Sequence, residues 1–106
     1  MVYVLKMTEM FEKKFYKLIP LSLQKQLWCR ILSLSKNPYV GKPLGYPFIR
    51  ELKLGKFRVY FTIFEDEVTV LMADISDKKN QQETIDLLIH NKEYLKKLVK
   101  NLKTIN

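Results

Sequence analysis

The chain has 106 residues, 47% of them hydrophobic, so it is long enough for one domain with a core of its own and too short for two. Its single cysteine excludes a disulfide framework and a cysteine-based metal cluster, and fits a reducing, cytoplasmic compartment. The formal net charge of +8 favours a polyanion or an acidic protein as partner. Charges interrupt every apolar stretch before the ~20 residues that a membrane span needs, and residues 1–6 are too soon charged for a signal peptide.

The first half of the chain predicts a strand and two helices. Residues 2–7 alternate loosely, as in a short strand at the edge of a sheet. Thr8 can cap a helix whose apolar residues have helical spacing until Pro20 ends it. A second helix is predicted over 22–36 with its first residue, a serine, as the N-cap. Two helices joined by so short a turn should pack as an antiparallel hairpin.

The second half predicts strands and one more helix. Residues 37–47 hold three prolines and two glycines, and an irregular loop is expected there. Three strands follow whose short connections predict an antiparallel meander, at about 48–54, 57–64 and 68–75. A last amphipathic helix is expected from about 81 to 103, with fraying over 101–106. The chain therefore reads as one α+β domain, 1–106, of order β-α-α-β-β-β-α, with the helical pair on one face of a small antiparallel sheet.

The hairpin at Gly55-Lys56 is the most informative segment. A two-residue turn there places Lys53 opposite Arg58 and Glu51 opposite Tyr60. The other face then suits a core, with Leu52, Leu54, Phe57, Val59 and Phe61. Because two cations directly opposite each other repel, a bound phosphate is the expected reason to keep such a pair. The alternative for Arg58 is a structural ion pair with Glu51 or Asp74.

This order of elements, with four sequence features, resembles the RelE/ParE superfamily of type II toxin-antitoxin toxins, and its RelE/HigB-like branch in particular. The features are Ser-Lys-Asn-Pro at 35–38, Gly-Lys-Pro-Leu at 41–44, the Arg50–Tyr60 hairpin, and Asp-Lys-Lys at 77–79. The resemblance covers residues 2 to about 85. The chain departs from the family at Glu51, where the motif has Arg. It also lacks the His-Arg pair and the Tyr that many relatives carry near the C-terminus.

The resemblance implies a metal-independent endoribonuclease, an mRNA interferase that cuts mRNA on the ribosome, inhibits translation and is neutralised by an antitoxin protein. Attack of a ribose 2′-OH on the adjacent phosphate needs a base, cations and an acid, and no cofactor or metal is expected. In this interpretation Arg58 binds the phosphate, Lys53 is a base or second clamp, and Lys78 is a clamp or proton donor. The remaining RNA contacts are expected from Lys79, Arg50, Lys42, Tyr60 and Tyr46.

Two other functions remain open. A ParE-like, non-enzymatic inhibitor of a protein target such as gyrase would have the same fold, and the missing C-terminal His and Tyr favour it. A catalytically inactive relative that only binds RNA is the other, and Glu51 in place of a motif Arg favours that.

Several candidate residues also have a plain structural interpretation. Packing is the alternative for the two tyrosines, and a solvated turn is the alternative for Lys78 and Lys79. Cys29 lies in an apolar helical pattern and is expected to be buried. His90, the only histidine, lies among polar neighbours and is expected to be exposed.

Overall fold

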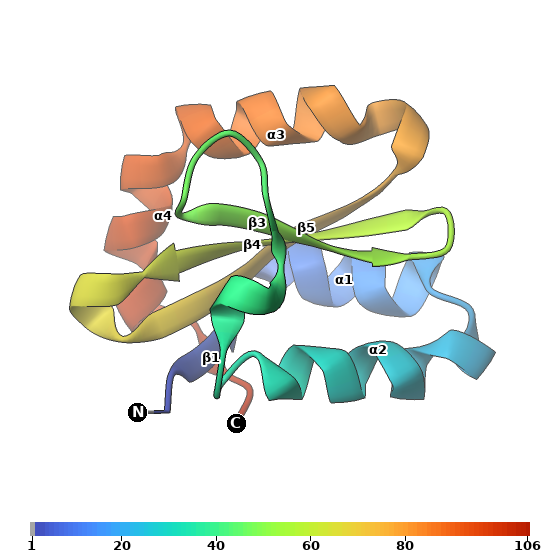
Figure 1. Ribbon diagram of the computed structural model, residues 1–106, viewed down its shortest axis with the longest axis horizontal. Coiled ribbons are helices and arrows are strands. Elements are labelled where there is room, and N and C mark those ends of the chain that lie inside the picture. The colour runs from blue at the N-terminus through green and yellow to red at the C-terminus, as the bar shows by residue number, and fades with distance from the viewer. Residues whose placement is uncertain (1) are drawn as a thin grey trace.

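The computed structural model describes residues 2–106, which form a six-stranded sheet with four α-helices (Figure 1). The strands are β1 (Val4–Met7), β2 (Lys42–Pro43), β3 (Ile49–Leu54), β4 (Phe57–Phe64), β5 (Thr69–Asp77) and β6 (Lys103–Thr104). The helices are α1 (Glu9–Leu18), α2 (Leu21–Ser33), α3 (Gln81–His90) and α4 (Lys92–Leu98). The α+β class is confirmed, while the order of elements gains two short strands and a second C-terminal helix. No helix within the described part has the length and apolar character needed to span a bilayer.

The hairpin register is as predicted. β3 and β4 pair antiparallel, with Lys53 opposite Arg58 and Glu51 opposite Tyr60. Gly55 has a φ of 58°, in the left-handed region where glycine meets no Cβ penalty, so the two-residue turn closes without strain. The five apolar residues of the other hairpin face are all buried in one core: Leu52, Leu54, Phe57, Val59 and Phe61.

The sheet has the order β2-β3-β4-β5-β1-β6, so the predicted meander forms its centre. β1 pairs parallel with β5, and β6 pairs antiparallel with the other side of β1. The first strand is therefore not the edge that was expected. Asn106 holds the C-terminus in place, because its Oδ1 accepts from the Leu5 N–H at 2.9 Å and its Nδ2 donates to the Tyr3 carbonyl at 3.1 Å. The expectation that 101–106 frays is wrong.

Helices α1 and α2 begin differently. Thr8 caps α1 as predicted, with its Oγ1 accepting from the Phe11 N–H at 3.0 Å, and the helix ends just before Pro20. α2 begins one residue before Ser22, and the N-cap position is held by Pro20, which has no side chain that could accept a hydrogen bond. The prediction of a serine cap is wrong, because Ser22 lies inside the first turn of the helix.

Cys29 is exposed, which corrects the expectation of a buried thiol. It lies two residues after Leu27, and a spacing of two places residues on opposite sides of a helix. Leu27 and Ile31 are fully buried, so they define the face that packs on the sheet. His90 is exposed as predicted.

The segment 37–47 is more regular than expected. A 3₁₀ turn at Pro38–Val40 is capped by Asn37, whose Oδ1 accepts from the Tyr39 N–H at 3.2 Å. β2 then pairs with β3 and places Lys42 opposite Glu51. The prolines and glycines do interrupt longer pairing, but they leave room for a strand of two residues.

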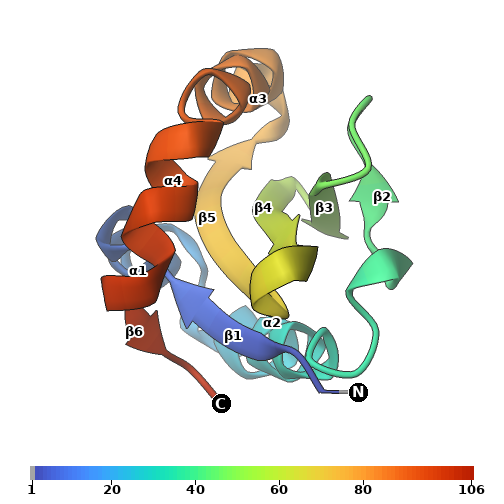
Figure 2. The ribbon, with the colours of Figure 1, turned by 90° about the vertical axis from the view of Figure 1, so that its left-hand side faces the viewer.

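Both faces of the sheet are covered, with α2 on one side and α3 on the other (Figure 2). The first core joins the α1–α2 hairpin to the sheet. The second joins α3 and α4 to the opposite face and includes Tyr60, Phe64, Leu71, Ile85 and Leu88. All eight residues of β4 are buried, because this central strand has a core on each side.

The C-terminal helix is not continuous as expected, because it breaks at Asn91 into α3 and α4. Asn91 Nδ2 donates to the Leu87 carbonyl at 2.9 Å, and its own carbonyl accepts from the Leu95 N–H at 2.9 Å. One residue thus ends the first helix and starts the second. The bend lets α4 pack across the sheet end instead of extending into solvent (Figure 1).

Candidate functional site

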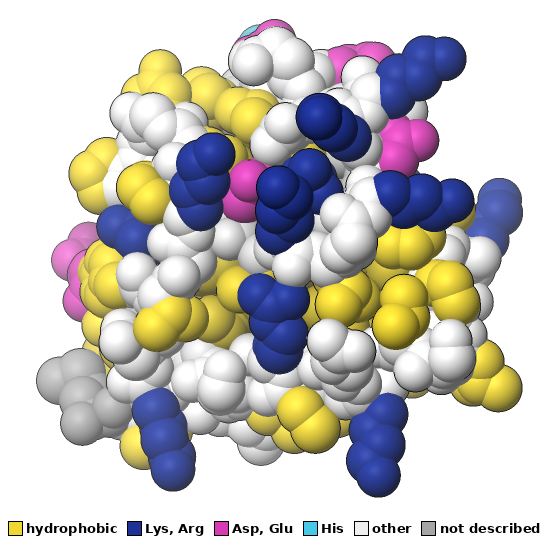
Figure 3. All heavy atoms as spheres, turned by 45° about the vertical axis from the view of Figure 1, so that its right-hand side comes forward, with side chains coloured by type: hydrophobic (Ala, Val, Ile, Leu, Met, Phe, Trp, Pro, Cys, Tyr) yellow, Lys and Arg dark blue, Asp and Glu magenta, His cyan; other side chains and the backbone are white. Residues whose placement is uncertain are grey.

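A hollow of about 460 Å³ is formed where the β3–β4 hairpin meets β2, α2 and the start of α3. Its lining includes five cationic residues, Arg30, Lys42, Lys53, Arg58 and Lys78. Figure 3 shows Lys and Arg side chains gathered around an acidic side chain on one face of the molecule. The hollow is thus a concentration of positive charge with one carboxylate, Glu51, in its lining.

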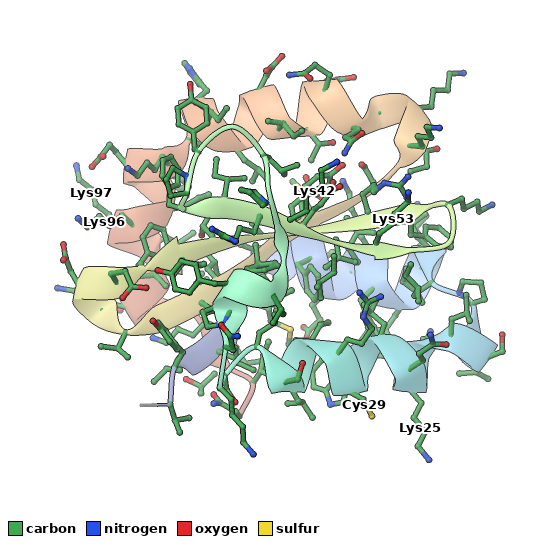
Figure 4. All side chains as sticks on the ribbon, viewed as in Figure 1. Lys25, Cys29, Lys42, Lys53, Lys96 and Lys97 are labelled. Carbon is green, nitrogen blue, oxygen red and sulfur yellow. The ribbon has the colours of Figure 1, made fainter. Side chains whose placement is uncertain are left out.

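The sheet register brings these side chains together. Lys42 lies opposite Glu51, and Glu51 lies opposite Tyr60, while Lys53 lies opposite Arg58. Cross-strand partners project to the same face of a sheet, as do residues two apart on one strand. The side chains therefore form two adjacent rows on the face that α3 partly covers. In Figure 4, Lys42 and Lys53 are labelled between the hairpin and α3.

Arg58 lies at the bottom of the hollow and is only 5% exposed. Its Nη1 donates to the carbonyls of Gly55 and Phe57, at 3.0 and 3.1 Å, which fixes the guanidinium beside the turn. No carboxylate within 4.0 Å pairs with it in the described chain, and Asp74 pairs instead with a lysine of α1. The structural ion pair considered for Arg58 does not form. Its remaining N–H groups can still donate to an anion in the hollow.

Lys53 differs from Arg58 in being exposed. It lies at the rim, where its ammonium can reach an anion that the guanidinium holds below. Lys42 and Lys78, from two other elements, are also exposed and also line the hollow. The arrangement around Arg58 is therefore a buried guanidinium held by backbone carbonyls, with three exposed lysines about it.

Glu51 is 5% exposed and is the carboxylate of the site. Gln81 Nε2, at the start of α3, donates to its Oε2 at 2.7 Å. Across the part of the chain that the structure describes, Oε1 has no recorded hydrogen bond. One oxygen of this carboxylate is thus held by the protein while the other remains able to accept.

Arg50, predicted as an RNA contact, does not line the hollow and is held by backbone carbonyls of the neighbouring loop. Its guanidinium donates to the carbonyls of Pro47, Tyr39 and Gly41, and lies 4.8 Å from the centre of the Tyr39 ring. This holds the loop before β2 against β3.

A hydrogen bond to Glu65 raises the pKa of Tyr39 to about 12, with burial and the Glu65 charge adding to the shift.

The two tyrosines and Lys79 do not line the hollow. Tyr60 is fully buried, its hydroxyl lies 2.7 Å from Ser76 Oγ, and burial raises the pKa of Tyr60. Its ring is not available to stack on a base, so it is left out of the candidate site. Tyr46 is 43% exposed beside Phe48, where a base could reach it.

Sequence reasoning missed Arg30 and Gln81. Arg30 reaches the hollow from α2, where its Nη1 donates to the Lys53 carbonyl at 2.6 Å. Both contacts depend on how the helices pack on the sheet, for which a single sequence has no signal. Glu51 could be placed by the hairpin register, but only the structure shows it held in the hollow.

The geometry suits a phosphate group with a hydroxyl beside it. Five cations, each from a different segment of the chain, can bind phosphate oxygens, and the carboxylate oxygen of Glu51 that has no partner can accept a hydroxyl proton. Within residues 2–106 no group of three or more His, Cys, Asp or Glu side chains is arranged to hold a metal ion.

No protein-family model and no characterised protein match the sequence. Similar solved structures exist, however. A mutant of E. coli toxin RelE in the free state matches with a TM-score of 0.68 and 19% identity, over 83% of this chain and 99% of that one. The toxin-antitoxin complex RelBE2 of Mycobacterium tuberculosis matches with a TM-score of 0.61 and 21% identity, over 73% and 92%.

The intact E. coli RelBE toxin-antitoxin complex matches with a TM-score of 0.61 and 19% identity, over 71% of this chain and 95% of that one. The matched chains are covered almost end to end, while the similarity covers 71–83% of this chain. The chain therefore has the fold of the RelE toxins.

Proposed function

We propose that this chain is a RelE-like toxin that cleaves mRNA on the ribosome without a metal ion, in the cytoplasm, and that a cognate antitoxin neutralises it. The observation that carries this proposal is the hollow in which Arg58 is fixed among three lysines from separate elements. The RelE fold supports it, and one similar structure is an E. coli RelE mutant bound to an antitoxin peptide. An acidic antitoxin segment would complement the net charge of +8.

The geometry suits attack of a ribose 2′-oxygen on the adjacent phosphate. Negative charge then develops on the phosphate oxygens, and the planar Arg58 guanidinium can engage two of them at once. Because two backbone carbonyls already hold Arg58, it needs no reorganisation when that charge develops. Lys53 and Lys42 hold the RNA backbone from the rim, and Lys78 donates the proton to the leaving 5′-oxygen.

Arg58→Gln tests the proposal, because glutamine removes the charge while keeping a polar side chain at a buried position. Wild-type protein expressed in a bacterial host should arrest growth and create new mRNA 5′ ends. The variant should slow cleavage by about 10²–10³-fold, the usual effect of losing one such donor. Mapping mRNA 5′ ends and measuring growth provide the two readouts.

Lys25→Ala, an exposed cation outside the hollow, is the matched control and should cut like the wild type. Thermal melting of both purified variants shows whether each is folded. Unchanged transcripts under wild-type expression would refute the ribonuclease. DNA damage without mRNA cleavage would show instead an inhibitor of a protein target.

A further inference from the structure

We propose that Glu51 is the general base that removes the proton from the attacking ribose 2′-OH, a role that rests on the proposed ribonuclease function. In this step the 2′-oxygen bonds to phosphorus and its proton passes to the Glu51 carboxylate. The bond between phosphorus and the 5′-oxygen breaks, and the leaving oxygen takes a proton from Lys78. The products are a 2′,3′-cyclic phosphate and a 5′-hydroxyl, so atoms and charges balance.

The position of Glu51 in the sheet supports this role. It lies on the same face as Lys53, two residues away, and that lysine lies opposite Arg58. A phosphate held by Lys53 and Arg58 would therefore have Glu51 one row further along the hairpin. A nucleotide places its 2′-hydroxyl next to its 3′-phosphate, so neighbouring rows suit the two groups.

The hydrogen bonding of Glu51 supports it as well. Gln81 holds Oε2 at 2.7 Å, which fixes the plane of the carboxylate. Oε1 is left as the acceptor for a hydroxyl. A general base needs a fixed orientation and one free lone pair, and this arrangement supplies both.

The position of the Glu51 carboxylate in this hollow is unfavourable for binding a phosphate, and this requires an explanation. It repels the phosphate that the surrounding cations attract, so a surface used only for binding RNA would be better without it. Burying it to 5% exposure adds a desolvation cost that the Gln81 hydrogen bond offsets only in part. Proton transfer gives the carboxylate a use that binding alone does not.

Lys53 is the rival base, and general chemistry favours the carboxylate. A lysine must lose its proton before it can accept one, which requires a strongly lowered pKa. Carboxylates as a class are ionised near neutral pH and accept a proton without activation. The titratable and charged groups that face Glu51 are Lys42, Lys53, Arg58, Tyr60, Lys78 and, from α2, Arg30.

Glu51→Gln tests the proposal, because it keeps the shape of the side chain and removes its basicity. The assay is single-turnover cleavage of mRNA bound to purified ribosomes, with binding of the same RNA measured separately. The variant should cleave more slowly than the wild type by about 10²–10⁴-fold, while binding RNA as tightly or more tightly.

Glu51→Asp keeps a carboxylate at a shorter reach, so it should cleave more slowly than the wild type but faster than Glu51→Gln, and it carries the test if Glu51→Gln melts early. Glu93→Gln, at an exposed position of α4, is the control and should match the wild type. A Glu51→Gln enzyme that cleaves at the wild-type rate would overturn the role of Glu51 alone. A wild type that cleaves no RNA would overturn the ribonuclease and Glu51 together.

Discussion

At residue 41 the chain passes too close to the core for any side chain. A Cβ added to Gly41 would lie 2.5 Å from Cζ of Phe61 and 3.2 Å from Cβ of Arg50. Phe61 is fully buried, so its ring cannot move without disturbing its neighbours. This glycine is needed for close approach, and that approach sets where β2 and Lys42 lie relative to the hollow.

Gly41→Ala should therefore lower the free energy of unfolding by about 1–3 kcal/mol, the usual cost of overpacking. Denaturant unfolding followed by circular dichroism measures this difference. Val40→Ala changes the preceding residue, which is 62% exposed, and should stay within about 0.5 kcal/mol of the wild type. Equal stability of the two variants would show that Phe61 yields without cost.

Single residues also show how far sequence reasoning reached into the site. The pairing of Lys53 with Arg58 could be predicted because a two-residue turn fixes the register of both strands. The burial of the Arg58 side chain could not be predicted, because it depends on hydrogen bonds to the carbonyls of the turn. The contacts of Arg50 could not be predicted, because its acceptors are backbone carbonyls of a loop. The sequence of that loop has no periodicity from which its path could be inferred.

At the scale of elements, the outer side of β5 has no strand partner along about half of its length. β1 pairs with β5 only as far as Met72, and no strand in the described chain continues beyond it. At Ile75 the backbone that lacks a strand partner bonds to side chains, since Asp74 Oδ1 accepts from its N–H at 2.7 Å and Lys14 Nζ lies 3.4 Å from its carbonyl. Lys14 and Asp74 also form a salt bridge of 2.7 Å. Open strand edges invite pairing with another chain, and this pair blocks that edge.

Lys14→Ala should lower the free energy of unfolding by about 1–3 kcal/mol, because it leaves the buried Asp74 carboxylate without its partner. It should also increase self-association, because the Ile75 carbonyl becomes free to pair. Denaturant unfolding and sedimentation measure the two effects. Lys17→Ala, an exposed lysine one turn further along α1, should change neither. A variant as stable and monomeric as the wild type would show that the pair does not protect the edge.

The elements that the sequence predicted well are those with enough residues to show a period. Helices α1 and α2 and strands β3, β4 and β5 all have repeating apolar positions or a clear cap. β2 and β6 have two residues each, too few for any alternation to appear. The break at Asn91 was missed because an asparagine is tolerated inside a helix, and only packing on the sheet turns it into a boundary.

The whole molecule is closed by its two ends, which lie near each other (Figure 1). The Ile105 N–H donates to the Leu5 carbonyl at 2.7 Å, and Lys6 Nζ donates to the Val99 carbonyl at 2.8 Å. These contacts join residues about a hundred positions apart, and no local pattern could have predicted them. They also account for the position of β1 inside the sheet instead of at its edge.

The net charge of +8 is a property of the whole molecule, and it could attract RNA in two ways that lead to different predictions. If RNA binds through the hollow, only the cations there release counterions from the phosphates. If it binds through the basic surface in general, every exposed lysine contributes equally. Lys53 lines the hollow, whereas Lys97 is a residue of α4 and lies at the opposite end of the molecule (Figure 4).

Lys53→Ala should therefore weaken binding of single-stranded RNA and reduce the slope of log affinity against log salt by about 0.7, the contribution of one phosphate contact. Lys97→Ala removes the same charge and should leave the slope unchanged. Fluorescence anisotropy of a labelled RNA, titrated at several salt concentrations, measures both. Equal losses of RNA affinity for the two variants would mean that binding depends on the total charge of the protein. The hollow would then not be the RNA-binding site.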